Sequence, residues 1–275
     1  NSATNLIEEF MLVCNETIAE DYYWQGVPFM FRNHEQPDSE KIEALRKILY
    51  QFGYRIKGRG EVHPREIQRL IEKISGTPYE NIISRIVLRS MKQAKYQAEN
   101  LGHFGLAAKY YCHFTSPIRR YPDLQIHRII KENISGGITE ERAKRYNSFM
   151  EEAAYHCSTT ERRADDAERE TDRLKMAEYM SERIGNVYDG IISGVTGWGI
   201  YVELPNTVEG MVPLNEIEDD FYEYEEENMR AVGRHTGKIY RLGDSVKVKV
   251  IRTDIQARTI DFMFTDDKGG NEDEN

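Results

Sequence analysis

The chain has 275 residues, of which 39% are hydrophobic and 31% charged, and its formal net charge is −10. This length is sufficient for two domains, and the apolar content permits folded cores. No segment is long and apolar enough to span a membrane, and the first residues are too acidic and polar for a signal peptide. The composition therefore predicts a cytoplasmic protein without a membrane partner, and a monomer is the starting expectation.

The cysteine content indicates a reduced chain. Cys14, Cys112 and Cys157 are an odd number and follow no metal-ligand spacing. A disulfide framework is therefore not expected, and packing is the predicted role of these thiols.

Helical spacing dominates the first part of the chain. Four residues at its start recur three or four positions apart, namely Leu6, Phe10, Val13 and Thr17. Further helices are predicted over residues 41–52, 64–74, 82–96 and 140–182. The last of these stretches is rich in Glu, Arg, Ala and Lys and contains no proline, and Gly185 lies just past its end. The chain is therefore expected to be mainly helical up to residue 183.

One turn in this helical part has the features of an anion site. Residues 113–130 read HFTSPIRRYPDLQIHRII, in which Pro122 suits the first helical position and Asp123 the first turn. Arg119 and Arg120 would then lie beside unpaired backbone N–H groups, an arrangement that suits phosphate or carboxylate. The alternative is a surface loop whose arginines pair with Asp123 and nearby glutamates. The motif alone leaves both interpretations open.

The periodicity changes after residue 183 from helical to alternating. Residues 187–195 alternate, and Gly197, Trp198 and Gly199 form a tight turn into residues 200–202. The stretches 210–213, 245–253 and 259–264 bring the number of predicted strands to about five, the number found in an OB-fold. The predicted class is therefore α+β, a helical part followed by a five-stranded barrel.

Candidate RNA contacts lie on this barrel. Trp198 and Tyr201 are predicted to stack on bases, and the alternative is that one of them fills the barrel. Trp198, between two glycines, is expected to be exposed, whereas core packing remains open for Tyr201. Three cations on a later strand could hold the RNA backbone, namely Lys247, Lys249 and Arg252. Alternation predicts that Val246, Val248 and Val250 turn inward between them.

The net negative charge is unevenly distributed. Acidic residues concentrate in the loop 216–227 and in the tail 266–275, which is expected to be disordered. Basic residues gather at 119–128 and 162–173. The chain could therefore bind RNA locally although it is acidic as a whole, and the acidic loop is interpreted as a solvated face.

Several long phrases carry a family resemblance. The block TSPIRRYPDLQIHR, preceded by RSMKQAKY and GHFGLA, resembles the C-terminal half of the catalytic domain of the ribonuclease II (RNB) family. NLIEEFMLVCNETIAE and CSTTERRADDAERETD are similar to the helices before and after this block in the same family. GNVYDGIISGVTGWGIYVEL and YRLGDSVKVKV resemble an S1-type RNA-binding domain. The implied organisation is part of the RNB domain in residues 1–183, an S1 domain in 184–265 and an acidic tail in 266–275.

The resemblance also implies a function. Members of the family degrade single-stranded RNA processively from the 3′ end, and Mg²⁺ activates the attacking water that releases 5′-mononucleotides. Arg119 would contact the phosphate at the scissile bond, with Arg120 as a second RNA contact, and Glu168 would lie near the reacting nucleotide. His103 and His127 are expected to make structural hydrogen bonds rather than act as a general base.

One departure limits this implication. The family's metal site is a cluster of aspartates in the N-terminal half of the catalytic domain, and this chain begins at Asn1 inside the later half. The pairs Asp165–Asp166 and Asp219–Asp220 do not replace that cluster, so no metal ligand is assigned here. We therefore expect a C-terminal fragment that is inactive by itself, and the alternative is a non-catalytic RNA-binding module.

Overall fold

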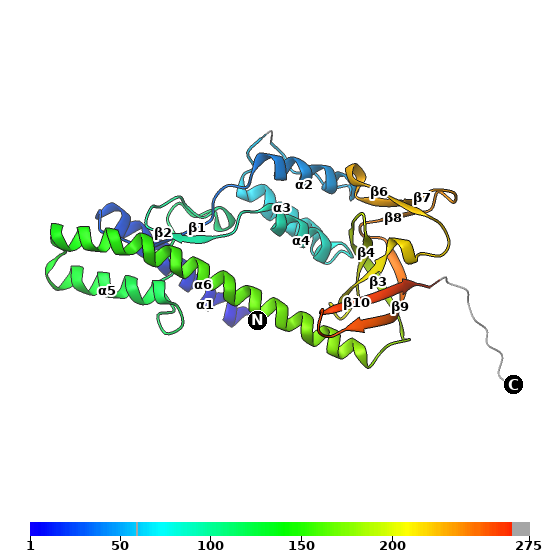
Figure 1. Cartoon of the computed structure of the whole chain (residues 1–275). Helices are drawn as coiled ribbons and strands as arrows, with labels where there is room; N and C mark the ends of the chain where they lie inside the picture. The colour runs from blue at the N-terminus through cyan, green and yellow to red at the C-terminus, as the bar shows by residue number, and fades with distance from the viewer. Residues whose placement is uncertain (59, 266–275) are drawn as a thin grey trace. The chain divides into compact units, whose positions relative to one another are not determined.

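The computed structural model describes residues 1–58 and 60–265, so the predicted acidic tail lies outside the described residues. Two compact units divide the chain after Ala164, within the long helix α6 (Glu140–Ser181). Both units therefore include part of α6, which Figure 1 shows as one continuous helix. Each unit has its own core, and each is described by itself.

The first unit is mainly helical, as expected. Its main elements in chain order are α1 (Ser2–Trp24), β1 (Phe31–Asn33), α2 (Ser39–Gln51), α3 (Pro64–Ile74), α4 (Glu80–Ser90), β2 (Lys95–Gln97) and α5 (Tyr121–Gly136). The predicted helices over 41–52 and 64–74 are confirmed, as is the helix predicted from the spacing of Leu6 to Thr17. The helix predicted over 140–182 is also confirmed.

The helix predicted over 82–96 is wrong at its C-terminal end. Helix α4 ends at Ser90, and Met91 has extended backbone angles. Residues Lys95–Gln97 instead form strand β2, which pairs antiparallel with β1. The buried Tyr96 ring and its backbone N–H, which donates to Ser158 Oγ at 2.9 Å, fix this strand. Tertiary pairing thus overrides the local helical spacing.

Two apolar clusters stabilise the first unit. The cluster between α2, α3 and α4 includes the fully buried Leu45, Leu49 and Ile83. The other lies between α1, α5 and the first half of α6 and includes Ile126 and Met150. Figure 1 shows α5 beside α6, to which the short turn after Gly136 connects it. Arg142 on α6 pairs with Glu132 on α5 at 2.8 Å, which fastens the two antiparallel helices.

The second unit contains a closed five-stranded barrel, as predicted. Its strands are β3 (Val187–Val195), β4 (Gly199–Glu203), β5 (Glu209–Pro213), β9 (Ser245–Asp254) and β10 (Thr259–Phe264). Their order around the barrel is β10-β5-β4-β3-β9, and β9 and β10 pair antiparallel to close it. Val248, Val250 and Phe262 are fully buried inside, and Met180 at the end of α6 packs against the same core. The barrel topology is that of an OB-fold.

The acidic stretch 216–227, interpreted from its sequence as a solvated loop, contains a strand. Strand β6 (Tyr222–Glu225) pairs with β7 (Arg230–Gly233), which pairs with β8 (Ile239–Arg241). The carboxylate of Asp220 accepts hydrogen bonds from the backbone of His235 at 2.9 Å and of Thr236 at 2.6 Å. These bonds lower the pKa of Asp220, and Asp219 pairs with Lys238 at 2.9 Å. The side chains of Asp219 and Asp220 are therefore held by residues that lie 15 or more positions later in the chain.

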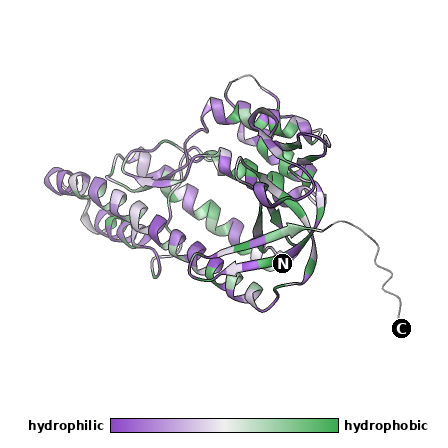
Figure 2. Cartoon of the chain, turned by 45° about the vertical axis from the view of Figure 1, so that its right-hand side comes forward, coloured by the Kyte–Doolittle hydropathy of each residue, from purple (hydrophilic) through white to green (hydrophobic). Residues whose placement is uncertain are grey.

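The surface of the helices is strongly polar. Figure 2 shows hydrophilic residues along most of the long helix α6. Across the described ranges, no helix combines the length and apolar character that a membrane span requires. The three cysteines are unpaired, and Cys112 and Cys157 are buried as their predicted packing role requires.

A glycine in the barrel provides a test of its packing. A Cβ added at Gly210 would lie 2.5 Å from Cε2 of the fully buried Phe262. We expect Gly210→Ala to lower the free energy of unfolding by about 1–3 kcal/mol through overpacking. Urea unfolding followed by Trp198 fluorescence, in a Trp24→Phe background, measures this change.

Gly194→Ala is the matched control in the same barrel. Its added Cβ would make an ordinary contact of 3.5 Å with the Tyr201 side chain. A change within about 0.5 kcal/mol is expected. Equal destabilisation by both substitutions would contradict the packing described for Gly210.

Candidate nucleic-acid interface

The turn before α5 is held by one buried carboxylate. Asp123 is 0% exposed. Its Oδ1 atom accepts from the backbone N–H of Ser116 at 2.7 Å and from Nη2 and Nε of Arg120 at 2.7 and 3.1 Å. The carbonyl of Ser116 in turn accepts from the backbone N–H of Arg120 at 3.1 Å. These bonds fix the backbone of residues 116–120 against the first turn of the helix.

The two arginines of this turn have different environments. Arg120 forms the ion pair with Asp123, as the alternative interpretation of the motif proposed. Arg119 is exposed, and its side chain makes no hydrogen bond or ion pair with any residue that the structure describes, whereas its backbone N–H donates to the Ser116 carbonyl at 3.3 Å. Arg119 stands two residues before Tyr121, the first residue of α5. The backbone N–H groups of the first turn of that helix favour an anion. Arg119 is therefore the arginine available to a phosphate.

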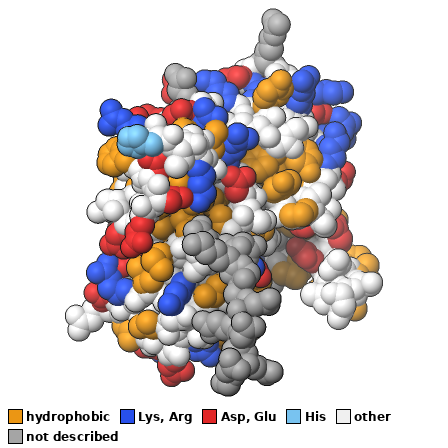
Figure 3. Space-filling view, turned by 90° about the vertical axis from the view of Figure 1, so that its right-hand side faces the viewer, with side chains coloured by type: hydrophobic (Ala, Val, Ile, Leu, Met, Phe, Trp, Pro, Cys, Tyr) orange, Lys and Arg blue, Asp and Glu red, His pale blue; other side chains and the backbone are white. Residues whose placement is uncertain are grey.

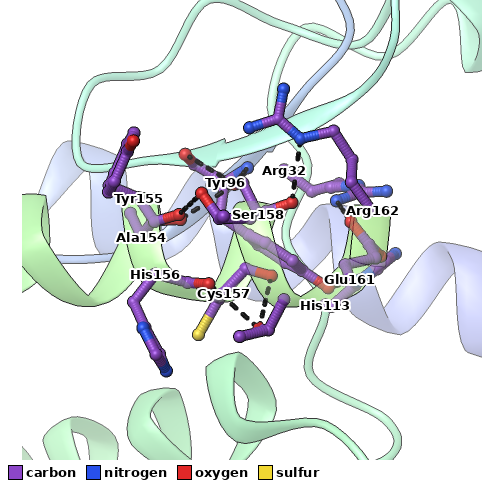
Figure 4. Close-up of polar contacts among 12 residues, drawn as sticks. Arg32, Tyr96, His113, Ala154, Tyr155, His156, Cys157, Ser158, Glu161 and Arg162 are labelled. Atoms are coloured by element: carbon purple, nitrogen blue, oxygen red, sulfur yellow. Dashed lines mark hydrogen bonds and ion pairs between the residues drawn. The ribbon is translucent and has the colours of Figure 1, made fainter. Parts of the chain in front are cut away.

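A polar network involves His113, three residues before Ser116, together with Arg32, Tyr96 and Glu161 (Figure 4). Arg32 donates from Nη1 to Glu161 Oε2 at 2.5 Å, and its guanidinium lies 4.5 Å from the centre of the Tyr96 ring. Tyr96 Oη and His113 Nδ1 are 2.8 Å apart. Strand β1, strand β2 and α6 are thus connected to the segment that enters the Arg119 turn. Glu161 and Ser158 are the residues through which α6 takes part.

The histidines near the turn are structural. Burial, together with the charges of Arg120 and Arg32, lowers the pKa of His113 to about 3. Burial likewise lowers the pKa of His103 to about 4, and His103 Nδ1 accepts from the backbone N–H of Leu106. His127 bonds to the Phe114 carbonyl at 2.9 Å and stacks on the Phe114 ring. The structural hydrogen bonds predicted for His103 and His127 are confirmed.

Glu168 lies on α6 in the second unit. Its side chain is exposed, and no ion pair involves it within residues 1–58 and 60–265. Nearby Arg169 pairs with Asp166 instead. The role predicted for Glu168 beside a reacting nucleotide stays a prediction.

Trp198 and Tyr201 form an aromatic pair on the outside of the barrel. Trp198 is 65% exposed, and its indole N–H donates to the Tyr201 hydroxyl at 3.0 Å. The exposure predicted for Trp198 is confirmed. Tyr201 is half-buried and lies outside the barrel core, so the alternative of core packing is not the one found. The pair offers ring surface for stacking.

The cations of β9 lie at a distance from the Trp198–Tyr201 pair. Lys247 is exposed and Lys249 half-buried, while Val248 and Val250 point inward, so the predicted alternation is confirmed. Register places Tyr201 opposite Gly194 and Lys247 opposite Asp189, five residues apart on β3. At about 3.3 Å per residue, roughly 16 Å of strand separates the two positions. The aromatic pair and these lysines therefore do not form one cluster.

Arg252 has a partner that the sequence did not indicate. Asp261 faces it across the β9–β10 pair and accepts from Arg252 Nε at 2.7 Å and Nη2 at 2.5 Å. The Arg252 side chain remains 69% exposed. The charge available for an RNA backbone at this position is therefore partly offset by Asp261.

The negative charge of the chain does not form one continuous surface on the face that Figure 3 draws. Figure 3 shows basic and acidic side chains interspersed with apolar ones on the visible face. The net charge of −10 is thus not spread as one continuous acidic surface on this side. Because the net charge is negative, an anion would be attracted by individual basic side chains and not by the charge of the whole chain.

Within residues 1–58 and 60–265, the carboxylates do not fit a magnesium site. Among the described residues, no group of three or more His, Cys, Asp or Glu side chains could hold a metal ion. Asp123 is committed to Arg120, and Asp219 and Asp220 are bonded to Lys238 and to the 235–236 backbone. Asp166 pairs with Arg169 on the surface of α6. No hydrolytic step can therefore be assigned to these carboxylates.

Comparison with known proteins identifies the class. The RNB domain model matches residues 1–136, and the S1 RNA binding domain model matches residues 181–263. The chain belongs to the RNB family of ribonucleases. Together with the barrel topology, these matches confirm the predicted α+β fold class.

Within the family, the chain is similar to ribonuclease R. Ribonuclease R of Thermotoga maritima is 42% identical over 96% of this chain, and that of Aquifex aeolicus is 45% identical over 94%. The matched regions make up 38% and 37% of those relatives. The chain thus spans little more than a third of their length.

Solved structures give the same result. The apo form of Mycoplasma genitalium RNase R matches 96% of this chain with a TM-score of 0.91 and 27% identity. The same enzyme in complex with ribose methylated single-stranded RNA matches with a TM-score of 0.90. In both structures the match covers 42% of the Mycoplasma chain.

The buried histidines predict a loss of stability in acid. The folded pKa values of His113 and His103, about 3 and about 4, lie below the ordinary value of 6.5. The unfolded chain therefore binds protons that the folded chain does not, and stability falls as the pH drops below about 6.5. Each histidine is expected to contribute a loss of about 2 kcal/mol between pH 7 and pH 5.

Urea titrations of wild type and His113→Gln at pH 7 and pH 5 measure this linkage. The variant is expected to lose about 2 kcal/mol less than wild type over this interval, because His103 still titrates. Comparing the difference between the two pH values removes any constant effect of the substitution. An identical pH dependence in both proteins would show that His113 is not buried in its neutral form.

Proposed function

We propose that this chain is the RNA-holding part of a processive exoribonuclease that hydrolyses single-stranded RNA from its 3′ end to 5′-mononucleotides. The observation that carries the proposal is Arg119, an exposed guanidinium without an ion pair among the described residues. It stands on a turn that buried Asp123 and Arg120 fix. The similarity to ribonuclease R, including the Mycoplasma enzyme with single-stranded RNA, supports this assignment.

Arg119 would hold a phosphate next to the bond that is cleaved. A guanidinium can donate two parallel hydrogen bonds to two phosphate oxygens and stabilise the charge that develops on them. Arg120 would keep Arg119 in place through Asp123, since its Nε and Nη2 already donate to this carboxylate. The family resemblance implies that Glu168 would act near the reacting nucleotide.

The barrel would hold the strand without reading its sequence. Trp198 and Tyr201 offer ring faces that any base can stack on, and Lys247, Lys249 and Arg252 would contact the backbone. This combination suits single-stranded RNA, whose bases are free to stack. We further propose that the protein acts in the cytoplasm as a monomer.

The chain by itself is proposed to bind RNA without cleaving it. Hydrolysis in the family depends on Mg²⁺, and the carboxylates of the described residues do not fit such a site. The metal ligands would be supplied by residues outside this chain. The same observation favours a second candidate function, a non-catalytic RNA-binding module.

Arg119→Ala tests the phosphate contact. We expect the affinity for single-stranded RNA to fall by about 1.5–3 kcal/mol, the contribution of hydrogen bonds to a charged group. The slope of log affinity against log salt should decrease by about 0.7, because one phosphate contact is lost. Fluorescence anisotropy with a labelled oligoadenylate across a salt series measures both quantities.

Arg145→Ala is the matched control. Arg145 is an exposed arginine on α6 that has no ion pair among the described residues. This substitution removes the same charge at a position outside the turn, so the affinity for single-stranded RNA should change little. Equal effects of Arg119→Ala and Arg145→Ala would mean that net charge, and not the turn, determines binding.

Trp198→Ala tests the stacking surface. The expected loss in RNA affinity is about 1–3 kcal/mol, and Trp198→Phe should retain much of the binding because a ring remains. Phe221→Ala removes another exposed ring from the same unit and serves as the control. Undiminished binding by folded Trp198→Ala protein would show that RNA does not stack there.

A nuclease assay separates the two candidate functions. With Mg²⁺ present, this chain is expected to release no 5′-mononucleotide, whereas the chain joined to the residues that its gene encodes before Asn1 is expected to release them. Release by the 275-residue chain that survives Arg119→Ala would overturn the proposal. Absence of release from the longer protein would favour the binding module.

A further inference from the structure

A pocket of about 750 Å³ lies in the first unit, and Arg119 does not line it. Its walls come from the start of α3, from the loop 100–110 and from His34 after β1, and no residue between His113 and Asp123 lines it. Its volume is within the range of about 300–1,000 Å³ that is usual for small-molecule sites. Neither the proposed phosphate contact nor the barrel surface accounts for it.

The charge of the pocket differs from that of the chain. Arg65 and Lys109 line it, and no aspartate or glutamate does, although the chain carries a net charge of −10. Both side chains are exposed, and neither has an ion pair among the described residues; Lys109 Nζ lies 5.2 Å from the centre of the Tyr110 ring, which also lines the pocket. Two unpaired cations around one concave site favour an anion.

Two histidines add hydrogen-bond donors to these cations. His63 Nδ1 accepts from the backbone N–H of Arg65, and His103 Nδ1 accepts from that of Leu106, each at 3.2 Å. In a neutral ring the proton is then on Nε2, which acts as a donor. Both histidines line the pocket, so its polar side chains include donors suited to phosphate oxygens.

The loop that forms one wall is fixed before any ligand binds. His103 N–H donates to the Ala108 carbonyl at 2.8 Å, and the Asn100 side chain donates to the Lys109 carbonyl at 3.0 Å. Gly102 has φ +78°, and a Cβ there would lie 3.2 Å from the Ala108 carbonyl oxygen. Ala107 adopts φ 54°, a left-handed conformation that is uncommon for a residue with a side chain. Such rigid loops reduce the ordering cost of binding.

Aromatic surface borders the cations. Tyr23 is partly exposed, and its ring centre lies 4.7 Å from that of buried Tyr110. Both rings line the pocket, as does Phe104. A ligand whose phosphate reached Arg65 or Lys109 could therefore bring a flat base to the Tyr23 ring.

We propose that this pocket binds a nucleotide unit, with its phosphate held by Arg65 and Lys109 and its base against Tyr23. The nucleotide could belong to an RNA strand or be a free 5′-mononucleotide, and the chemistry of recognition is the same. The lining of the pocket supports nucleotide binding by itself, whereas an RNA strand as the source of the nucleotide rests on the proposed function. The site would be a second phosphate contact, independent of Arg119.

The test uses 5′-AMP as the probe, with adenosine and inorganic phosphate for comparison. Calorimetry on the whole chain should show that 5′-AMP binds more tightly than either part alone. Arg65→Gln with Lys109→Gln should weaken 5′-AMP binding at least about tenfold, as loss of charge-assisted hydrogen bonds implies. Tyr23→Leu should weaken 5′-AMP binding but leave phosphate binding unchanged.

Lys144→Gln with Arg145→Gln is the matched control, because it removes two exposed cations from α6, which does not line the pocket. Its 5′-AMP affinity should equal that of wild type. Equal weakening by both double variants, or no weakening by the pocket variant, would overturn the proposal. So would a failure of 5′-AMP to bind to wild type.

Two further binding measurements show whether the nucleotide belongs to an RNA strand or is free, and they test this proposal separately from the proposed function. If the pocket variant also loses affinity for oligoadenylate, the site holds an RNA strand, and if only 5′-AMP binding is lost, it holds the free mononucleotide. Arg119→Ala should leave 5′-AMP binding at the pocket intact. Failure of the Arg119 and Trp198 tests would remove the proposed RNA function while leaving the 5′-AMP result interpretable.

Discussion

The buried carboxylate of Asp123 is the constraint on which the candidate phosphate site depends. Removing a charge from water costs several kcal/mol unless hydrogen bonds and an opposite charge offset it. Here a single oxygen of Asp123 receives the Ser116 backbone N–H and two donors of Arg120. The carboxylate therefore determines both the backbone of the turn and the orientation of Arg120. Arg119 is then the arginine of this turn that has no ion pair among the described residues.

The two RNA surfaces proposed here act through different physical interactions. The turn offers charge and directional donors, whose contribution weakens as salt screens it. The Trp198–Tyr201 pair offers ring area, whose contribution is largely independent of salt. Neither distinguishes one base from another. A chain with these two surfaces is suited to a strand of any sequence, even though its net charge is negative.

Local patterns were sufficient where one chemical rule determines the outcome. The inward valines of β9 follow from alternation, and the long helix α6 from composition and the absence of proline. Sequence could not distinguish Arg119 from Arg120, because both precede the same helix and only the fold brings one to Asp123. It also missed strand β6 and the Arg252–Asp261 pair, which depend on partners distant in the chain.

Because His113 is buried in its neutral form, it contributes to the pH dependence of folding but not to the positive charge around the Arg119 turn. Arg32 and Arg120 lower the pKa of His113 to about 3 in addition to the larger effect of burial, so the ring stays neutral over the physiological range. The positive charge around the turn therefore comes from arginines, a residue type whose guanidinium group stays charged in proteins. Acid would thus destabilise the polar network of His113 before it altered the charge that a phosphate encounters. In the proposed function, the phosphate contact of Arg119 would weaken with salt, whereas the stability of the scaffold that presents Arg119 depends on pH.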